Sequence, residues 1–237
     1  MVDRISKEKL NIILVVDSSR SMGGKRIKQV DNAILDIKEY LKNLQVENSN
    51  VDFYMTVIVF GDDAYFYGDK ESINIDDFNY EGIKCRGNTN IHCGYEKLGE
   101  ILKKESKGGI MPDFGGAAPI ILLLTDGHPT NMKYKEVLKN ISSSPWFKVA
   151  LRYGIAIELN DDRTIKVLND FVGNNGDVIS CYNADMLKNI IKIIILTASK
   201  VKSTSSNVLA TEHQSTQHQE IKQLIGEKLV DTESWEW

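Results

Sequence analysis

Cysteine is scarce in this chain, and long apolar runs and clusters of basic residues are missing. The three cysteines, Cys85, Cys93 and Cys181, are too few and too odd in number for a disulfide framework. The first residues carry charges where a secretory signal would be apolar. Both observations favour a reducing, cytoplasmic location.

The chain offers little that suits a membrane or a nucleic acid. Its most apolar stretch, 190–198, is interrupted by Lys192 and falls well short of the roughly 20 residues that span a bilayer. We therefore expect a core helix there. The 29 Lys and Arg residues are balanced by 33 Asp and Glu residues, for a net charge of −4, and form no basic stripe. Neither nucleic acid nor a membrane surface is an expected partner.

Short apolar runs alternate with helical patterns along most of the chain. The run 11–16 is almost continuously apolar and rich in β-branched residues, which is typical of a strand buried on both faces. Further strands are predicted over 51–60, 64–67, 119–124, 146–157 and 178–181. Helices are predicted over 27–44, 91–102, 134–141, 161–172 and 184–201.

This alternation predicts an α/β fold: a doubly wound, mostly parallel, Rossmann-like sheet with helices on both faces. The Gly61-Asp62-Asp63 turn predicts a hairpin, and with it one antiparallel edge strand. In such sheets, ligands bind beyond the carboxyl ends of the strands, where the strand order reverses. Polar residues directly after strands are therefore the candidate site residues.

The composition changes after the last predicted helix. We assign 1–201 to one domain and 202–237 to a polar, acidic tail with at most a short helix over 221–229. The tail carries three Lys against five Glu and one Asp, so it holds −3 of the net charge of −4. Its two tryptophans, Trp235 and Trp237, suit a contact segment better than a core.

Oxygen-bearing side chains follow two of the buried strands. Asp17, Ser19 and Ser21 form a D-x-S-x-S sequence directly after the first strand. Asp126 follows the 119–124 strand, and Thr89 stands in a G-N-T-N segment just before a helix. If the two strands are neighbours where the strand order reverses, all five oxygens can converge on one crevice. Hydroxyl and carboxylate oxygens are hard ligands that suit Mg²⁺.

The charge of this ligand set predicts what the ion would do. With few anionic ligands, and with some of the five oxygens reaching it through water, the ion keeps net positive character, and at least one coordination position stays open to an outside ligand. A closed calcium cage would surround the ion with more carboxylates. The sequence therefore predicts a protein partner that offers an exposed Asp or Glu to the metal.

Taken together, the D-x-S-x-S loop, the G-N-T-N-I segment and the T-D-G after a buried strand resemble the metal-ion-dependent adhesion site (MIDAS) of von Willebrand factor A (VWA) domains. The resemblance covers about 10–201. It implies a non-enzymatic binding domain in which magnesium or manganese is held by one set of residues: Asp17, Ser19, Ser21, Thr89 and Asp126. Arg20 stands where many members have Gly, and its charge could repel a metal or attract an acidic ligand.

The wider runs ILVVDSSRSM, GNTNI and ILLLTDGHPT are similar to the bacterial tellurite-resistance, TerY-like branch of this family. That similarity implies a scaffold or regulator in a stress-response system. Its expected partners are a PP2C-type phosphatase or a kinase. Two hypotheses concern the tail. It is a solvated docking segment for another protein, which we favour, or it mediates self-association, in which Asp231, Glu233 or Glu236 reaches the metal of a neighbouring molecule.

Several other sites fit the sequence less well. A phosphate-binding loop needs Gly where Ser19 stands and Ser or Thr where Arg26 stands. A phosphohydrolase of the haloacid dehalogenase type needs a second carboxylate two residues after Asp17, again at Ser19. The chain has no G-x-S-x-G elbow. A magnesium-dependent phosphohydrolase that uses the same five residues remains the alternative function.

A zinc site is the last alternative. Cys85, Cys93, His92 and His128 could share one face of the molecule, but their spacing matches no zinc pattern. We interpret them as buried thiols and exposed loop imidazoles.

Overall fold

The structure is a computed structural model that describes residues 7–47, 50–158, 161–173, 176–202 and Gln223. Its strands are β1 (Glu8–Asp17), β2 (Val51–Phe60), β3 (Ala64–Phe66), β4 (Ile73–Asn74), β5 (Ile120–Thr125), β6 (Leu151–Ile157) and β7 (Gly176–Cys181). Its helices are α1 (Lys25–Glu47), α2 (Ile91–Ile101), α3 (Tyr134–Ile141), α4 (Pro145–Val149), α5 (Asp162–Val172) and α6 (Ala184–Lys202).

All of these strands belong to one sheet, in the order β3-β2-β1-β5-β6-β7, with β4 also paired to β2. The long strands run parallel, whereas β3 and β4 are both antiparallel to β2 and together form one edge. The predicted α/β architecture with an antiparallel edge is confirmed. From β1 the chain first builds the β2 side of the sheet and then returns to build the β5 side. The strand order therefore reverses between β1 and β5.

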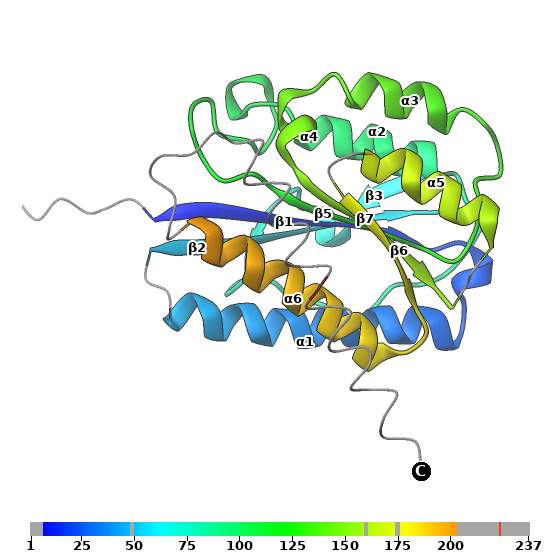
Figure 1. The fold of residues 1–237 in the computed structure, drawn as a ribbon, viewed down its shortest axis with the longest axis horizontal. Coiled ribbons are helices and arrows are strands. Elements are labelled where there is room, and N and C mark those ends of the chain that lie inside the picture. Colours follow the sequence, from blue (N-terminus) through cyan, green and yellow to red (C-terminus); the bar gives the residue numbers. More distant parts are fainter. Residues whose placement is uncertain (1–6, 48–49, 159–160, 174–175, 203–222, 224–237) are drawn as a thin grey trace, which may run out of the picture.

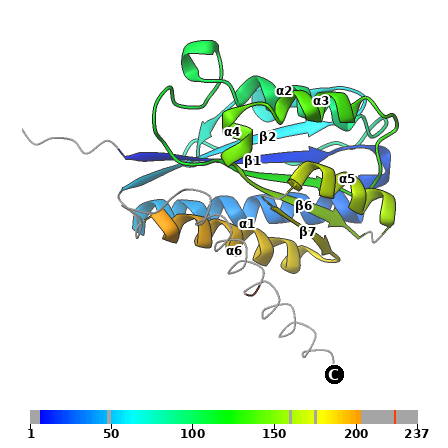
Figure 2. The same ribbon diagram turned by 45° about the horizontal axis from the view of Figure 1, so that its top comes forward.

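Helices cover both faces of the sheet. On one face α1 and α6 lie side by side, and on the other lie α2, α3 and α5 (Figures 1 and 2). Successive side chains of a strand point to opposite faces. Ile12 and Leu14 of β1 accordingly pack in the core under α1 and α6, whereas Ile13 and Val15 pack in the core under α2. An unbroken apolar run is what a strand in this position requires.

One predicted boundary is wrong. The expected strand over 146–157 begins only at Leu151, and α4 occupies Pro145–Val149 instead. The physical reason is Pro145, which stands at the first turn of α4. Its fixed φ is already helical, and its missing N–H is not needed there.

The described part of the chain contains no helix with the length and apolar character that a membrane span needs. The predicted helix 184–201 is confirmed as α6, which ends at Lys202. The predictions for the tail, including its short helix, lie outside the described residues apart from Gln223.

Candidate metal centre

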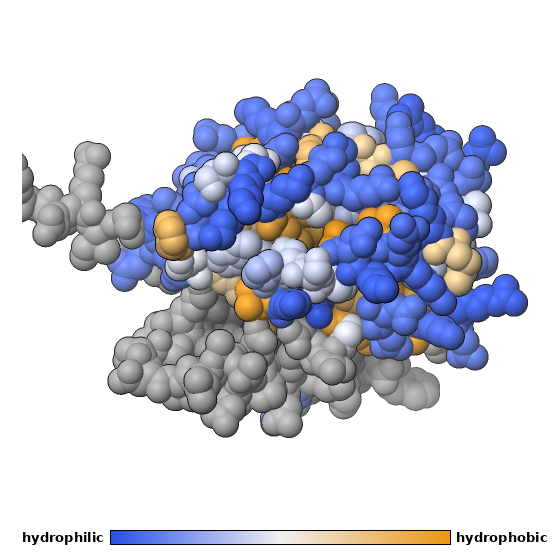
Figure 3. Space-filling view, turned by 90° about the horizontal axis from the view of Figure 1, so that it is seen from above, coloured by the Kyte–Doolittle hydropathy of each residue, from blue (hydrophilic) through white to orange (hydrophobic). Residues whose placement is uncertain are grey.

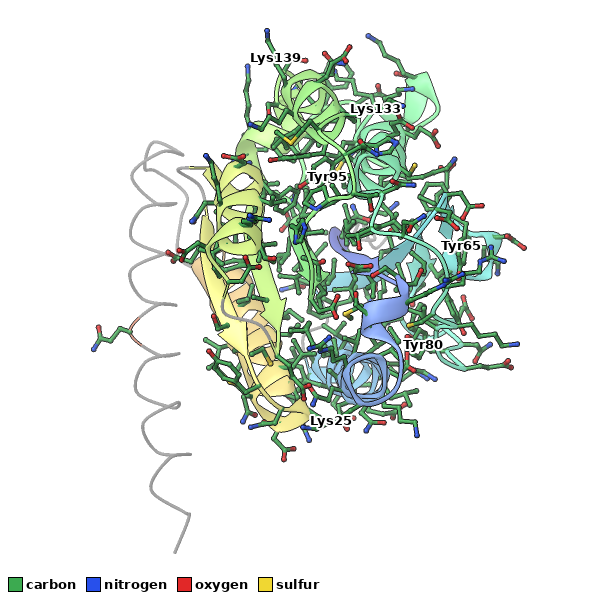
Figure 4. The ribbon with its side chains drawn as sticks, turned by 90° about the vertical axis from the view of Figure 1, so that its right-hand side faces the viewer. Lys25, Tyr65, Tyr80, Tyr95, Lys133 and Lys139 are labelled. Carbon is green, nitrogen blue, oxygen red and sulfur yellow. The ribbon has the colours of Figure 1, made fainter. Side chains whose placement is uncertain are left out.

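Three loops meet at the carboxyl edge of the sheet, where β1 and β5 end side by side. Val16 pairs with Leu124 in the parallel ladder, which brings the two following residues, Asp17 and Thr125, next to each other. This is the edge that Figure 4 faces, with Lys25 at the start of α1 on one side of the sheet and Lys133 before α3 on the other. The sequence-based expectation that the two strands are neighbours is confirmed.

Backbone hydrogen bonds hold these loops together. The Arg86 N–H donates to the Ser18 carbonyl at 2.7 Å, and the Arg20 N–H donates to the Gly87 carbonyl at 3.2 Å. The loop before α2 is thereby fixed to the loop after β1. On its other side, the Thr130 N–H donates to the Thr89 carbonyl at 3.0 Å. The position of Thr89 thus depends on both strand-end loops.

Asp17 is fully buried at the base of the site. Its Oδ1 accepts the Ser19 N–H at 2.8 Å, and its Oδ2 accepts the Thr125 hydroxyl at 2.5 Å. Burial nevertheless raises the pKa of Asp17 to about 6, and the nearby charge of Asp126 adds to the increase. No basic side chain of the described residues pairs with this carboxylate. A cation beside it would offset the cost of burying its charge.

The remaining predicted ligands lie around Asp17. Ser19 Oγ and Ser21 Oγ are 3.1 Å apart, and Ser21 Oγ donates to Asp126 Oδ1 at 2.7 Å. A Cβ atom added to Gly127 would lie 3.7 Å from Thr89 Oγ1 and 4.0 Å from Ser21 Oγ. The two hydroxyls therefore border the same small space. All five residues that the sequence singled out are gathered at this edge.

Arg26 is a site residue that the sequence reasoning missed. Its Nη1 lies 2.6 Å from Asp126 Oδ2 and also donates to the Ser21 carbonyl at 3.1 Å. Its Nε is 3.6 Å from Glu158, which also pairs with Lys25 at 2.8 Å. Arg20, the cation that the sequence drew attention to, is exposed. Arg26 thus places a positive charge in direct contact with Asp126.

A shallow cleft of about 470 Å³ opens over this group. Ser21, Thr89 and Asp126 line its base, together with Arg26. His128, Asp161 and Arg163 complete its rim. The open side of the site is therefore wide enough to admit a side chain from another molecule.

The donor set suits a hard divalent cation. In the described part of the chain, no three His, Cys, Asp or Glu side chains come together in a way that could hold a metal. The site at the sheet edge instead relies on three hydroxyls and two carboxylates, which are ligands for Mg²⁺ or Mn²⁺ rather than for a soft metal. The three cysteines are free thiols, and Cys181 is buried.

Comparison with known families identifies the domain. The model of the von Willebrand factor type A domain matches residues 11–192. The chain belongs to this family. The matched range begins within β1 and ends within α6, and it contains all three loops of the site.

Sequence relatives of this VWA domain include heavy chains of inter-alpha-trypsin inhibitor. Heavy chain H1 from Sus scrofa is 29% identical over 145 residues, which cover 58% of this chain and 15% of the relative. Heavy chain H2 from Mus musculus is 30% identical over 166 residues, which cover 68% of this chain and 17% of the relative. The chain thus spans less than a fifth of the length of these relatives.

Solved structures share the fold of the VWA domain at low sequence identity. The ArnB paralog VWA2 from Sulfolobus acidocaldarius aligns with a TM-score of 0.55 at 16% identity, over 79% of this chain and 45% of that one. Proximal thread matrix protein 1 from the mussel byssus, with a zinc-occupied MIDAS motif, aligns with a TM-score of 0.54 at 15% identity. It covers 82% of this chain and 48% of that one.

Proposed function

We propose that this VWA domain is a metal-dependent protein-binding module. Asp17, Ser19, Ser21, Thr89 and Asp126 hold one Mg²⁺ or Mn²⁺, directly or through water, and the ion binds an acidic side chain of a partner protein. The observation that carries the proposal is Asp17, a fully buried carboxylate without a basic partner among the described residues. It lies beside a connected row of site oxygens that opens to a cleft.

Binding fits this site better than catalysis. Both carboxylate oxygens of Asp17 are already hydrogen bonded, and the residue is fully buried. That environment suits a group that holds a cation and not one that attacks phosphorus as a nucleophile. A phosphohydrolase would instead turn over a phosphate ester with Mg²⁺, and would lose that turnover in Asp17→Ala.

The cation and the biological setting are the finer parts of the proposal. Zinc in the MIDAS motif of the mussel protein supports a divalent cation at such a site, and the hydroxyl-rich set favours Mg²⁺ or Mn²⁺. The scarce cysteines favour a cytoplasmic location, and the motif runs around Asp17, Thr89 and Asp126 favour a role in a bacterial tellurite-resistance system. Its acidic partner would then be a PP2C-type phosphatase or a kinase.

Titration of Mg²⁺ by isothermal calorimetry tests the metal site. Asp17→Ala removes a carboxylate from the base of the site, so we expect the affinity for Mg²⁺ to fall by about 100-fold or more. Asp63→Ala is the matched control, because Asp63 is largely exposed and makes only a 3.9 Å contact to Arg86. Equal affinity in Asp17→Ala and the wild type would end the proposal.

Partner binding requires a separate measurement. We expect a chelator to release partners captured from the native cell while circular dichroism shows an intact fold, because the sheet core does not depend on the ion. Loss of the fold in chelator would instead identify a structural metal.

Arg26→Gln is expected to bind Mg²⁺ about tenfold more tightly than the wild type, because the guanidinium competes with the cation for Asp126. Calorimetry of this variant gives the affinity. Arg163→Gln is the control for charge alone, since Arg163 lines the same cleft without a contact to Asp126. A weaker affinity in Arg26→Gln would show that Arg26 orients Asp126 for the metal.

A further inference from the structure

An apolar groove lies between the C-terminal ends of α2 and α3. Its volume is about 390 Å³, and its apolar lining includes Leu102, Ile141, Pro145 and Trp146. Gly99 of α2 contributes no side chain, and a Cβ atom there would lie 2.9 Å from Ile141 Cγ2. The two helices can therefore pack closely beneath the groove. Trp146 is half-buried, so part of its ring remains available to another group.

The groove is separate from the metal centre. Thr89 precedes the first turn of α2, whereas the groove lies at the last turn of this 11-residue helix. The two ends of such a helix are about 16 Å apart. Figure 3 views the face formed by α2, α3 and α5, where hydrophilic surface predominates and apolar side chains emerge near the middle. The lining of the groove is therefore distinct from the metal loops, by which we mean the loops that carry Asp17, Thr89 and Asp126.

The rim of the groove is basic. Lys103, Lys104 and Lys107 line it, and no acidic residue does. Lys104 Nζ donates to the Asp113 carbonyl at 2.8 Å and lies 5.2 Å from the ring centroid of Phe114. The Phe114 residue is 92% exposed. The groove thus offers apolar rings bordered by positive charge, which suits an occupant that is both aromatic and acidic.

The chain itself contains a segment of this chemistry. Residues 231–237 read D-T-E-S-W-E-W, with three carboxylates and two of the three tryptophans of the protein. We propose that this segment docks into the groove of its own chain. Its indole rings cover the apolar lining around Trp146, and its carboxylates face the three lysines.

Both the energetics and the reach of the tail support this occupant. Aromatic rings bury large apolar areas, and the attraction between the three lysines and the three carboxylates sets the orientation and turns into repulsion when one side is reversed. The 28 residues of 203–230 separate the end of α6 from the segment. Extended, they span roughly 90 Å, well beyond the radius of gyration of about 16 Å expected for a domain of this size. The tether also supplies an effective concentration in the millimolar range.

Tryptophan quenching in the full chain tests the proposal. In Trp146→Phe the remaining tryptophans are Trp235 and Trp237, so acrylamide quenching reports their exposure. We expect a Stern–Volmer constant below that of the free peptide 231–237. Lys103→Glu with Lys107→Glu should raise it to the peptide value, and adding Glu233→Lys and Glu236→Lys should restore the protection.

A control and a reciprocal reporter complete the design. Lys70→Glu with Lys84→Glu makes the same change in net charge at exposed lysines outside the groove, and should leave the quenching constant unchanged. In Trp235→Phe with Trp237→Phe, Trp146 reports on the groove directly, and Glu233→Lys with Glu236→Lys should expose it. This second reporter leaves Trp146 unaltered.

Three results would overturn the proposal. One is that, in Trp146→Phe with an unaltered tail, the tryptophans are quenched as readily as in the free peptide, or stay protected after the lysine reversals. A second is protection that falls on dilution, which assigns the segment to the groove of a second copy. The third is protection that disappears in chelator, which assigns the segment to the metal loops.

Discussion

In the presence of a chelator, Asp17→Asn is expected to be more stable than the wild type at pH 7, by up to about 3 kcal/mol, although it lacks one of the proposed metal ligands. The reason is the burial of Asp17, which holds its pKa at about 6 against the ordinary 3.8. That difference corresponds to about 3 kcal/mol. An asparagine keeps the shape and removes the charge, and the Thr125 hydroxyl can rotate to accept from its amide.

The sign of the pH dependence follows from proton uptake. Between pH 4 and pH 6 folded Asp17 keeps its proton while unfolded Asp17 loses it, so the wild-type free energy of unfolding falls as the pH rises. The loss is complete above the folded pKa. The asparagine of the variant has no proton to lose. The stability difference between variant and wild type should therefore vanish below about pH 4 and reach its full value above about pH 6.

Urea unfolding at a series of pH values in chelator measures this difference. Other titrating groups cancel, because only the variant and the wild type are compared. Repeating the series with Mg²⁺ should stabilise the wild type and leave Asp17→Asn unchanged, since only a state that binds the ion gains from it. A variant less stable than the wild type at pH 7 in chelator would mean that hydrogen bonds to the ionised carboxylate outweigh its desolvation.

Much of the fold could be predicted because each buried strand must be apolar on both faces. The runs 11–16 and 119–124 are typical of central strands, and β1 and β5 occupy those positions. The gathering of the candidate ligands followed from the same alternation, because parallel strands on either side of the reversal end at one edge. The role of these residues as metal ligands stays a prediction.

Other features depend on contacts that no local pattern contains. Arg26 is the second residue of α1, and nothing in its local sequence distinguishes it from other charged residues of a helix. Its contact with Asp126 joins residues that are 100 positions apart in the sequence. Thr125 is part of the T-D-G sequence, but its hydrogen bond to Asp17 could be inferred only from the pairing of β1 with β5. Strand β4 has only two residues, Ile73 and Asn74, and is too short for alternation to reveal it. The expected strand at 146–149 became α4 because the proline before it suits a helix start.

The role of Arg152 could not be predicted from the sequence pattern, because the function of a charged residue in a buried strand depends on partners that only the fold brings to it. It is 6% exposed and lies in β6. Its guanidinium donates to the carbonyls of Phe147, Phe171 and Val172, at the C-terminal ends of α4 and α5. It also lies 4.3 Å from the Phe147 ring centroid. One cation thus satisfies carbonyls that two helix ends leave without partners.

Arg152→Met is therefore expected to lower the free energy of unfolding by about 3 to 5 kcal/mol. The substitution leaves three buried carbonyls without a hydrogen-bond donor and puts an apolar side chain beside them. Arg152→Lys should lose less, since an ammonium keeps the charge but cannot reproduce the planar fork of the guanidinium. Urea unfolding followed by circular dichroism measures both.

Arg86→Met is the matched control for the stability measurement. Its side chain is 74% exposed and makes only a 3.9 Å surface contact, so its loss should cost less than about 0.5 kcal/mol. Arg152 stands at the amino end of β6, at the opposite edge of the sheet from the metal loops. Folded Arg152→Lys should accordingly bind Mg²⁺ with wild-type affinity. A parallel loss of affinity and stability would show that the two edges of the sheet are coupled, and that the metal loops depend on how α4 and α5 are anchored.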